Sequence, residues 1–146
     1  PCVSIICDVL LGGKKMEVGI KGKRERIVPY EQTAEYISSG LLPVFATPCM
    51  IQFMEETARL SVEPYLAEGQ STVGTLVNVK HLASTFVGSK VTCETELIEV
   101  DRRKLVFSVK VYDETELVGE GIHERFIIDN RKFIDKLEAK KQSLNK

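Results

Sequence analysis

A carboxylate and an imidazole stand out in this sequence, because each falls on the apolar side of the element predicted to carry it. Glu55 lies next to Met54 in a helical stretch, within or beside the apolar stripe of that helix. His81 ends an alternating run and shares the face of Val79. An ionisable side chain that turns inward is costly unless it is paired or hydrogen-bonded. Glu55 and His81 therefore form either a general acid–base pair or a structural pair, and the pattern alone allows both.

The helix that carries Glu55 is predicted to span residues 48–67. Thr47 precedes Pro48, and this order is typical of an N-cap hydroxyl followed by proline at the first helical position. Pro64 comes late in the stretch and is expected to kink or shorten the helix. Residues at helical spacing predict a buried stripe, namely Ile51, Met54, Ala58 and Val62. The opposite stripe is polar and consists of Gln52, Glu56, Arg59 and Glu63.

The strand that carries His81 is predicted over residues 72–84, as the first of four consecutive strands. The other three are 90–100, 104–112 and 116–128, and a further strand is predicted earlier, over 16–29. Strict alternation places Val73, Thr75, Val77, Val79 and His81 on the inward face, and Gly74, Leu76, Asn78 and Lys80 on the other. The short turns between the last four strands indicate antiparallel neighbours. This order predicts an α+β fold, with one long helix against a curved antiparallel sheet of about five strands.

Two further segments have weaker patterns. Residues 30–39 are weakly helical, and we interpret them either as a plain connector or as a mobile flap over a pocket. Residues 131–141 are predicted to form a short C-terminal helix. Met16 would make a natural start, so we expect residues 1–15 to be an N-terminal extension and residues 16–146 to be a single domain.

Composition excludes several function classes. The net charge of −1 and the scattered Lys and Arg residues argue against a nucleic-acid binder. No apolar run approaches the roughly 20 residues that span a membrane. The four cysteines show no C-x-x-C spacing and are interpreted as reduced thiols of a cytoplasmic protein. With two histidines and no HExxH sequence, we expect no metal site and no cofactor.

Three motifs carry a resemblance to a known family. They read FATPxMxxxMExxA from Phe45, GTxVxVxHLAST from Gly74 and GxGxHERFII from Gly119. In this order and spacing they resemble the hot-dog-fold thioesterases of the fluoroacetyl-CoA thioesterase type, over roughly residues 16–133. The resemblance implies a hot-dog fold, in which the sheet wraps around the long helix, and a homodimer.

The resemblance also implies a site. It places catalytic residues at Thr47, Glu55 and His81, a glycine near the bound acyl group at Gly74, and an arginine near the site at Arg125. The implied reaction is hydrolysis of an acyl-CoA thioester to a free acid and CoA, with CoA entering only as part of the substrate. The alternatives are a non-catalytic acyl-CoA-binding hot-dog protein and a hot-dog hydratase or dehydratase.

Thioester hydrolysis requires an oxyanion site and a nucleophile. Free N–H groups at the helix N-terminus, here those of Cys49 or Met50, could bind the oxyanion. Either Thr47 attacks, with His81 as its base and Glu55 orienting the imidazole, or Glu55 activates water or attacks directly. A thiolate attack by Cys49 is a further alternative, although buried cysteine is more often an apolar filler. His123 is interpreted as a structural strand residue, and Arg125 either pairs with an acid or contacts a CoA phosphate.

Overall fold

The structure is a computed structural model that describes residues 14–145. The predicted extension 1–15 falls outside this range, apart from its last two residues. The helices are α2 (Ala34–Ile37), α3 (Thr47–Val62) and α4 (Asn130–Ser143), and the short 3-10 turns are η1 (Tyr30–Gln32) and η2 (Glu63–Tyr65). The strands are β1 (Lys21–Ile27), β2 (Gln70–His81), β3 (Lys90–Asp101), β4 (Lys104–Tyr112) and β5 (Leu117–Asp129).

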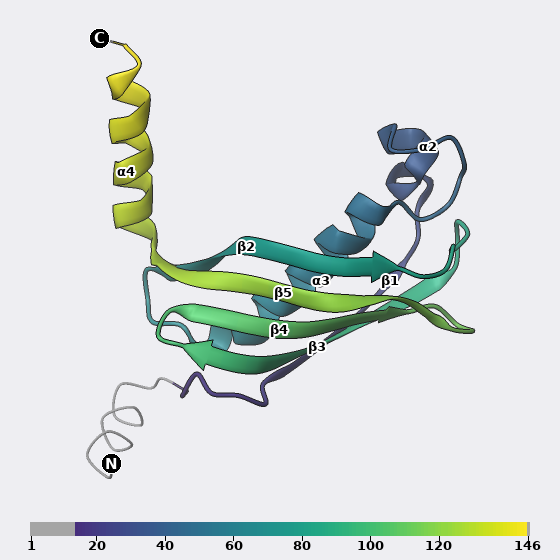
Figure 1. Ribbon diagram of the computed structural model, residues 1–146, viewed down its shortest axis with the longest axis horizontal. Helices are drawn as coiled ribbons and strands as arrows, with labels where there is room; N and C mark the ends of the chain where they lie inside the picture. Colours follow the sequence, from purple (N-terminus) through teal and green to yellow (C-terminus); the bar gives the residue numbers. More distant parts are fainter. Residues whose placement is uncertain (1–13, 146) are drawn as a thin grey trace.

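A five-stranded antiparallel sheet lies against one face of α3, as Figure 1 shows. The strand order is β1-β3-β4-β5-β2, so β2 is an edge strand although it directly follows the central helix in sequence. The predicted α+β arrangement, with one long helix on a sheet of five antiparallel strands, is confirmed. The C-terminal helix α4 leaves the end of β5 and extends away from the sheet, past β2 in this view.

The core fills the space between α3 and the sheet. The helix buries Met50, Phe53, Met54, Thr57, Ala58 and Val62. Ile51 is only half-buried, so the predicted stripe is rotated slightly towards Met50 and Phe53. The α-helix ends at Val62 and continues as the 3-10 turn η2, which contains Pro64. The expected shortening at this proline is confirmed, because proline removes a helical N–H and clashes with the preceding turn.

The first helical residue is Thr47, which corrects the prediction that it is the N-cap. Ala46 occupies the N-cap position and makes no side-chain capping bond, while Pro48 lies within the first turn. A threonine inside the helix cannot satisfy the first-turn N–H groups as a cap residue does. Its hydroxyl is therefore available for another partner.

The alternation of β2 is broken by a β-bulge between Gly74 and Leu76, and this corrects the predicted faces of the strand. Paired residues of neighbouring strands share a face, and Gly74 pairs with the buried Arg125 of β5. The extra residue, Thr75, restores the predicted parity from Val77 onward, so that Val77, Val79 and His81 face inward as expected. Gly74, which was expected on the outer face, instead faces α3. Val73 and Thr75, which were expected on the inward face, do not face α3.

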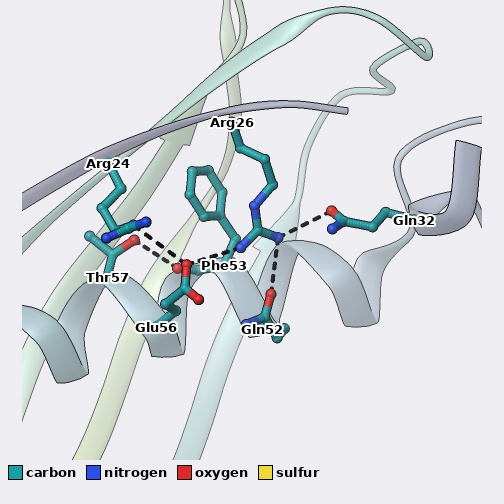
Figure 2. A network of polar contacts seen from close by, with 7 residues as sticks. All are labelled: Arg24, Arg26, Gln32, Gln52, Phe53, Glu56 and Thr57. Atoms are coloured by element: carbon teal, nitrogen blue, oxygen red, sulfur yellow. Dashed lines mark hydrogen bonds and ion pairs between the residues drawn. The ribbon is translucent and has the colours of Figure 1, made fainter. Parts of the chain in front are cut away.

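The polar stripe of α3 is joined to β1 by an arginine network (Figure 2). Arg26 donates to Gln52 at 2.9 Å and to Glu56 at 3.1 Å, and its guanidinium lies over the Phe53 ring with 4.4 Å between its carbon and the ring centroid. It also donates to Gln32 of η1 at 3.1 Å. The network thereby connects η1 and β1 to the polar stripe of α3.

Candidate active site

Thr47 and His81 meet at the N-terminal end of α3. The hydroxyl oxygen of Thr47 lies 2.7 Å from Nδ1 of His81, the last residue of β2. The contact joins two residues that are 34 positions apart in the sequence. The start of the helix and the end of an edge strand therefore place a hydroxyl and an imidazole in hydrogen-bonding distance.

A pocket of about 670 Å³ opens beside this pair. Its lining includes Thr47, Pro48 and Ile51 of α3 and His81 of β2. Its other residues come from the segment before α3 and from the loop after β2: Ala34, Ser39, Val44, Phe45, Ala46, Leu82, Ala83 and Ser84. Residues 30–39, interpreted from sequence as a connector or a flap, thus contribute part of the pocket wall. Pockets of this size are large enough for a small-molecule substrate.

Burial lowers the pKa of His81, while an interaction with the backbone of Ala83 acts in the opposite direction. The imidazole is thus biased towards its neutral form, which is the form that can accept a proton. Its Nε2 is buried and makes no hydrogen bond of standard geometry to the described residues. With a proton on Nε2, the Nδ1 atom is free to accept from the Thr47 hydroxyl.

Of the two N–H groups predicted as oxyanion donors, one has no backbone partner among the described residues. The Met50 N–H donates to the carbonyl of Ala46 at 2.9 Å and is thus occupied. Among the described residues the Cys49 N–H has no such backbone bond, which leaves it as the donor that an oxyanion could use. Burial raises the pKa of the Cys49 thiol, and the opposing effect of Arg26 is smaller. A raised pKa disfavours the thiolate, so attack by Cys49 is not supported.

Glu55 lies with a different set of residues. Its Oε2 is 3.7 Å from Nη1 of Arg125, which is 5% exposed, while Glu55 itself is 42% exposed. A Cβ atom at Gly74 would lie 3.2 Å from Oε2 of Glu55, 3.2 Å from Cε1 of His123 and 3.4 Å from Nη1 of Arg125. Gly74 therefore allows β2 to approach these three side chains closely.

The predicted Thr47, Glu55 and His81 thus fall into two groups within one chain. Thr47 and Glu55 are eight residues apart on α3, which corresponds to about 12 Å along the helix axis. The described residues include no hydrogen bond between Glu55 and either Thr47 or His81. The helix and the sheet bring the first pair together and hold Glu55 beside Arg125 and Gly74.

The residues around Glu55, namely Thr72, Gly74, His123 and Arg125, form a set called here the Glu55 group. Two buried members of this group, Thr72 and His123, were not recognised from sequence as functional. Arg125 donates one hydrogen bond to the Thr72 hydroxyl and another to the His123 ring. The available signal was a glycine within a strand pattern, which often indicates a bulge or a close approach. His123 and Arg125, two positions apart on one strand, also had to share a face.

The described residues contain no cluster of His, Cys, Asp and Glu that could hold a metal ion. Within residues 14–145, no helix has the length and apolar character needed to cross a membrane.

The chain is similar in sequence to proteins of a known family. The profile of the fluoroacetyl-CoA-specific thioesterase family (FlK) matches residues 28–131. The fluoroacetyl-CoA thioesterase of Streptantibioticus cattleyicolor is 33% identical over 131 residues, which cover 86% of this chain and 94% of the relative.

Solved structures agree with the sequence matches. A structure of the fluoroacetyl-CoA thioesterase FlK superposes with a TM-score of 0.83 at 32% identity, covering 87% of this chain and 98% of that one. A thioesterase-superfamily protein of Thermus thermophilus reaches 0.83 at 27% identity, covering 90% of this chain and 98% of its own. Mutants of FlK have been solved with fluoroacetate and CoA, and with acetyl-CoA. The fold is therefore the hot-dog fold that the motifs implied, as a hot-dog-like protein of Thermanaerovibrio acidaminovorans with a TM-score of 0.80 also indicates.

Proposed function

Because this chain belongs to the fluoroacetyl-CoA-specific thioesterase family, we propose that it hydrolyses an acyl-CoA thioester and that Thr47 and His81 carry the reaction. The observation that carries this proposal is the 2.7 Å contact between the Thr47 hydroxyl and His81 Nδ1, beside a pocket at the start of α3. A weakly nucleophilic hydroxyl needs a base at this distance, and a neutral imidazole is a suitable base at neutral pH.

In the proposed reaction, His81 Nδ1 takes the proton of the Thr47 hydroxyl as its oxygen forms a bond to the thioester carbonyl carbon. The Cys49 N–H and the N-terminal dipole of α3 stabilise the oxyanion that develops. When the carbon–sulfur bond breaks, the imidazolium returns the proton to the CoA sulfur. Water, deprotonated by the same imidazole, then hydrolyses the acyl ester and regenerates the Thr47 hydroxyl.

We propose that Glu55 acts in this site across a homodimer. The edge of β2 supports this, because Gly74 to Asn78 are exposed and include Leu76 at 43% and Val77 at 38%. An unpaired strand edge with apolar side chains favours pairing with a second copy. Antiparallel pairing about a two-fold axis would place the Gln70 half of one β2 against the His81 half of the other. The partner subunit's Glu55 would then approach the Thr47–His81 pair.

The test is thiol release from a panel of acyl-CoAs, including acetyl-CoA, fluoroacetyl-CoA and longer acyl chains. We expect turnover with at least one of them, and a fall of roughly 100-fold or more in kcat for His81→Ala with the fold retained. A reaction without substrate corrects for reagent consumed by the protein's own four cysteines. Saturable binding of acyl-CoA without turnover would instead make the protein an acyl-CoA-binding module.

Mass spectrometry of the enzyme quenched during turnover tests the nucleophile. Fragmentation of the peptide that contains both Thr47 and Glu55 locates the acyl group. An acyl group on Thr47 supports the mechanism above, whereas an acyl group on Glu55 would show that Glu55 is the nucleophile.

A further inference from the structure

We propose that His123 is a positioning residue, which fixes the Arg125 guanidinium against Glu55 and at the same time holds the β2 bulge beside it. The proposal rests on the function proposed above, since it assigns a role within the same site. It concerns Glu55, His123 and Arg125, which take no part in the proton transfers between Thr47 and His81 described above.

Every nitrogen of the Arg125 guanidinium has a partner. Nε donates to Thr72 Oγ1 at 2.8 Å, and Nη2 donates to the carbonyl of Thr72 at 2.9 Å. Nη1 donates to His123 Nε2 at 3.1 Å and lies 3.7 Å from the Glu55 carboxylate. A buried guanidinium is stable only when its N–H groups are satisfied, and a planar fork held at three corners has a single orientation. Its one acidic partner in this arrangement is Glu55.

Two contacts independently assign the tautomer of His123. A guanidinium N–H can only donate, so Nε2 must be an unprotonated acceptor. The Leu76 carbonyl can only accept, and it lies 2.8 Å from Nδ1, so Nδ1 must carry the proton. A doubly protonated ring would place an Nε2–H against an Arg125 N–H.

The surroundings favour this neutral ring. Burial lowers the pKa of His123, and the nearby Arg125 cation lowers it further. The bond to Leu76 and the carboxylates of Glu55 and Glu124 act in the opposite direction. The ring also stacks on Phe107, with 6.3 Å between ring centroids and 28° between planes.

The bond to Leu76 connects Arg125 to the backbone irregularity of β2. Leu76 is the first residue after the bulge, and Gly74 before the bulge packs against Glu55, His123 and Arg125. The His123 ring therefore links the β2 backbone at the bulge to the orientation of the Arg125 guanidinium. A displacement of about 1 Å at a reacting group can lower a rate about 100-fold, so this coupling is expected to affect kcat.

The experiment uses two substitutions that each keep one half of the ring's bonding. His123→Asn retains a donor near the Nδ1 position and loses the acceptor for Arg125. His123→Gln retains an acceptor near the Nε2 position and loses the donor for Leu76. If His123 acts through Arg125, His123→Asn should lower kcat about 10- to 100-fold with little change in KM, and His123→Gln should lower it less.

A double mutant separates positioning from general stability. In an Arg125→Gln background, His123→Asn should cause no further loss of kcat, because the group that it positions is already absent. Val109→Ala, at a buried apolar residue of β4, is the control for destabilisation alone. The proposal would be overturned if His123→Asn lowered kcat equally in the wild-type and the Arg125→Gln backgrounds. It would also be overturned if Val109→Ala lowered kcat as much as His123→Asn does.

Nitrogen NMR of the imidazole tests the tautomer without any substrate. We expect a protonated Nδ1 and an unprotonated Nε2 for His123 at neutral pH. An Nε2–H tautomer or an imidazolium would overturn the proposal even in an active enzyme. If the expected tautomer is found but no acyl-CoA is hydrolysed, the proposed function fails while the arrangement of His123 and Arg125 stands.

Discussion

The Oε2 atom of Glu55 lies 3.7 Å from Nη1 of Arg125, and among the described residues Glu55 makes no hydrogen bond with His81 of its own chain. His81 contacts Thr47 instead, about two helical turns towards the N-terminus of α3. In the dimer proposed above, Thr47 and His81 of one chain and Glu55 of the other would form one site across the open edge of β2.

This division predicts complementation between inactive chains. We expect Glu55→Gln and His81→Ala each to lower kcat by roughly 100-fold or more as homodimers. Mixed dimers of the two variants would contain one intact site and one doubly substituted site. After unfolding and refolding together, the mixture should recover roughly a quarter of the wild-type activity.

The same mixture provides its own control. Refolding each variant alone should recover no activity. If Glu55 and His81 act within one chain, every site in the mixed dimer keeps one lesion and the mixture stays inactive.

Substitutions of Thr47 separate chemistry from helix capping. Since Ala46 is the N-cap, Thr47→Ala removes no capping bond, so its melting temperature should stay close to that of the wild type. Its kcat should fall roughly 100-fold or more, because no hydroxyl remains to accept the acyl group or to orient water. Thr47→Ser keeps a hydroxyl and should be milder. A fully active Thr47→Ala enzyme would remove Thr47 from the mechanism.

Gly74→Ala tests the close approach of β2 to the Glu55 group. The added methyl would lie 3.2 Å from both Glu55 Oε2 and His123 Cε1, so these side chains must move by a few tenths of an ångström. We expect kcat to fall about 10-fold or more while the protein remains folded. The comparison variant is Asn78→Ala, because Asn78 lies on β2 as Gly74 does. Gly69→Ala is unsuitable, because Gly69 has a φ of +82°. Unchanged kinetics in Gly74→Ala would mean that the reacting groups tolerate this displacement.

The pKa of His81 predicts the acid side of the pH profile. The base must be neutral, and burial lowers its pKa below the usual value of about 6.5. The value of kcat/KM should therefore rise with pH through a midpoint below 6.5 and be level at neutral pH. A profile of kcat/KM against pH, with thermal melts at each pH to confirm folding, measures this midpoint. A midpoint above 7 would show that the titrating group is not a desolvated imidazole.

Local patterns in the sequence predicted most of the fold. Helical spacing located α3, and alternation located the four strands from β2 to β5, because these periods are set by backbone geometry. The motifs led to the family, and the family to Thr47 and His81, which the structure places 2.7 Å apart. His81 could also be assigned to the inner face, since parity is unbroken from Val77 onward.

Only the tertiary structure decided how the polar residues are partnered. Periodicity assumes one residue per step, and the β2 bulge inserts one, which turns Gly74 inward and Thr75 outward. The N-cap is Ala46 rather than Thr47, and the Thr47 hydroxyl contacts His81 at the end of β2. Glu55 was expected to pair with His81, yet β5 carries Arg125 closer to it. Such choices depend on which strands become neighbours, and no local pattern encodes that order.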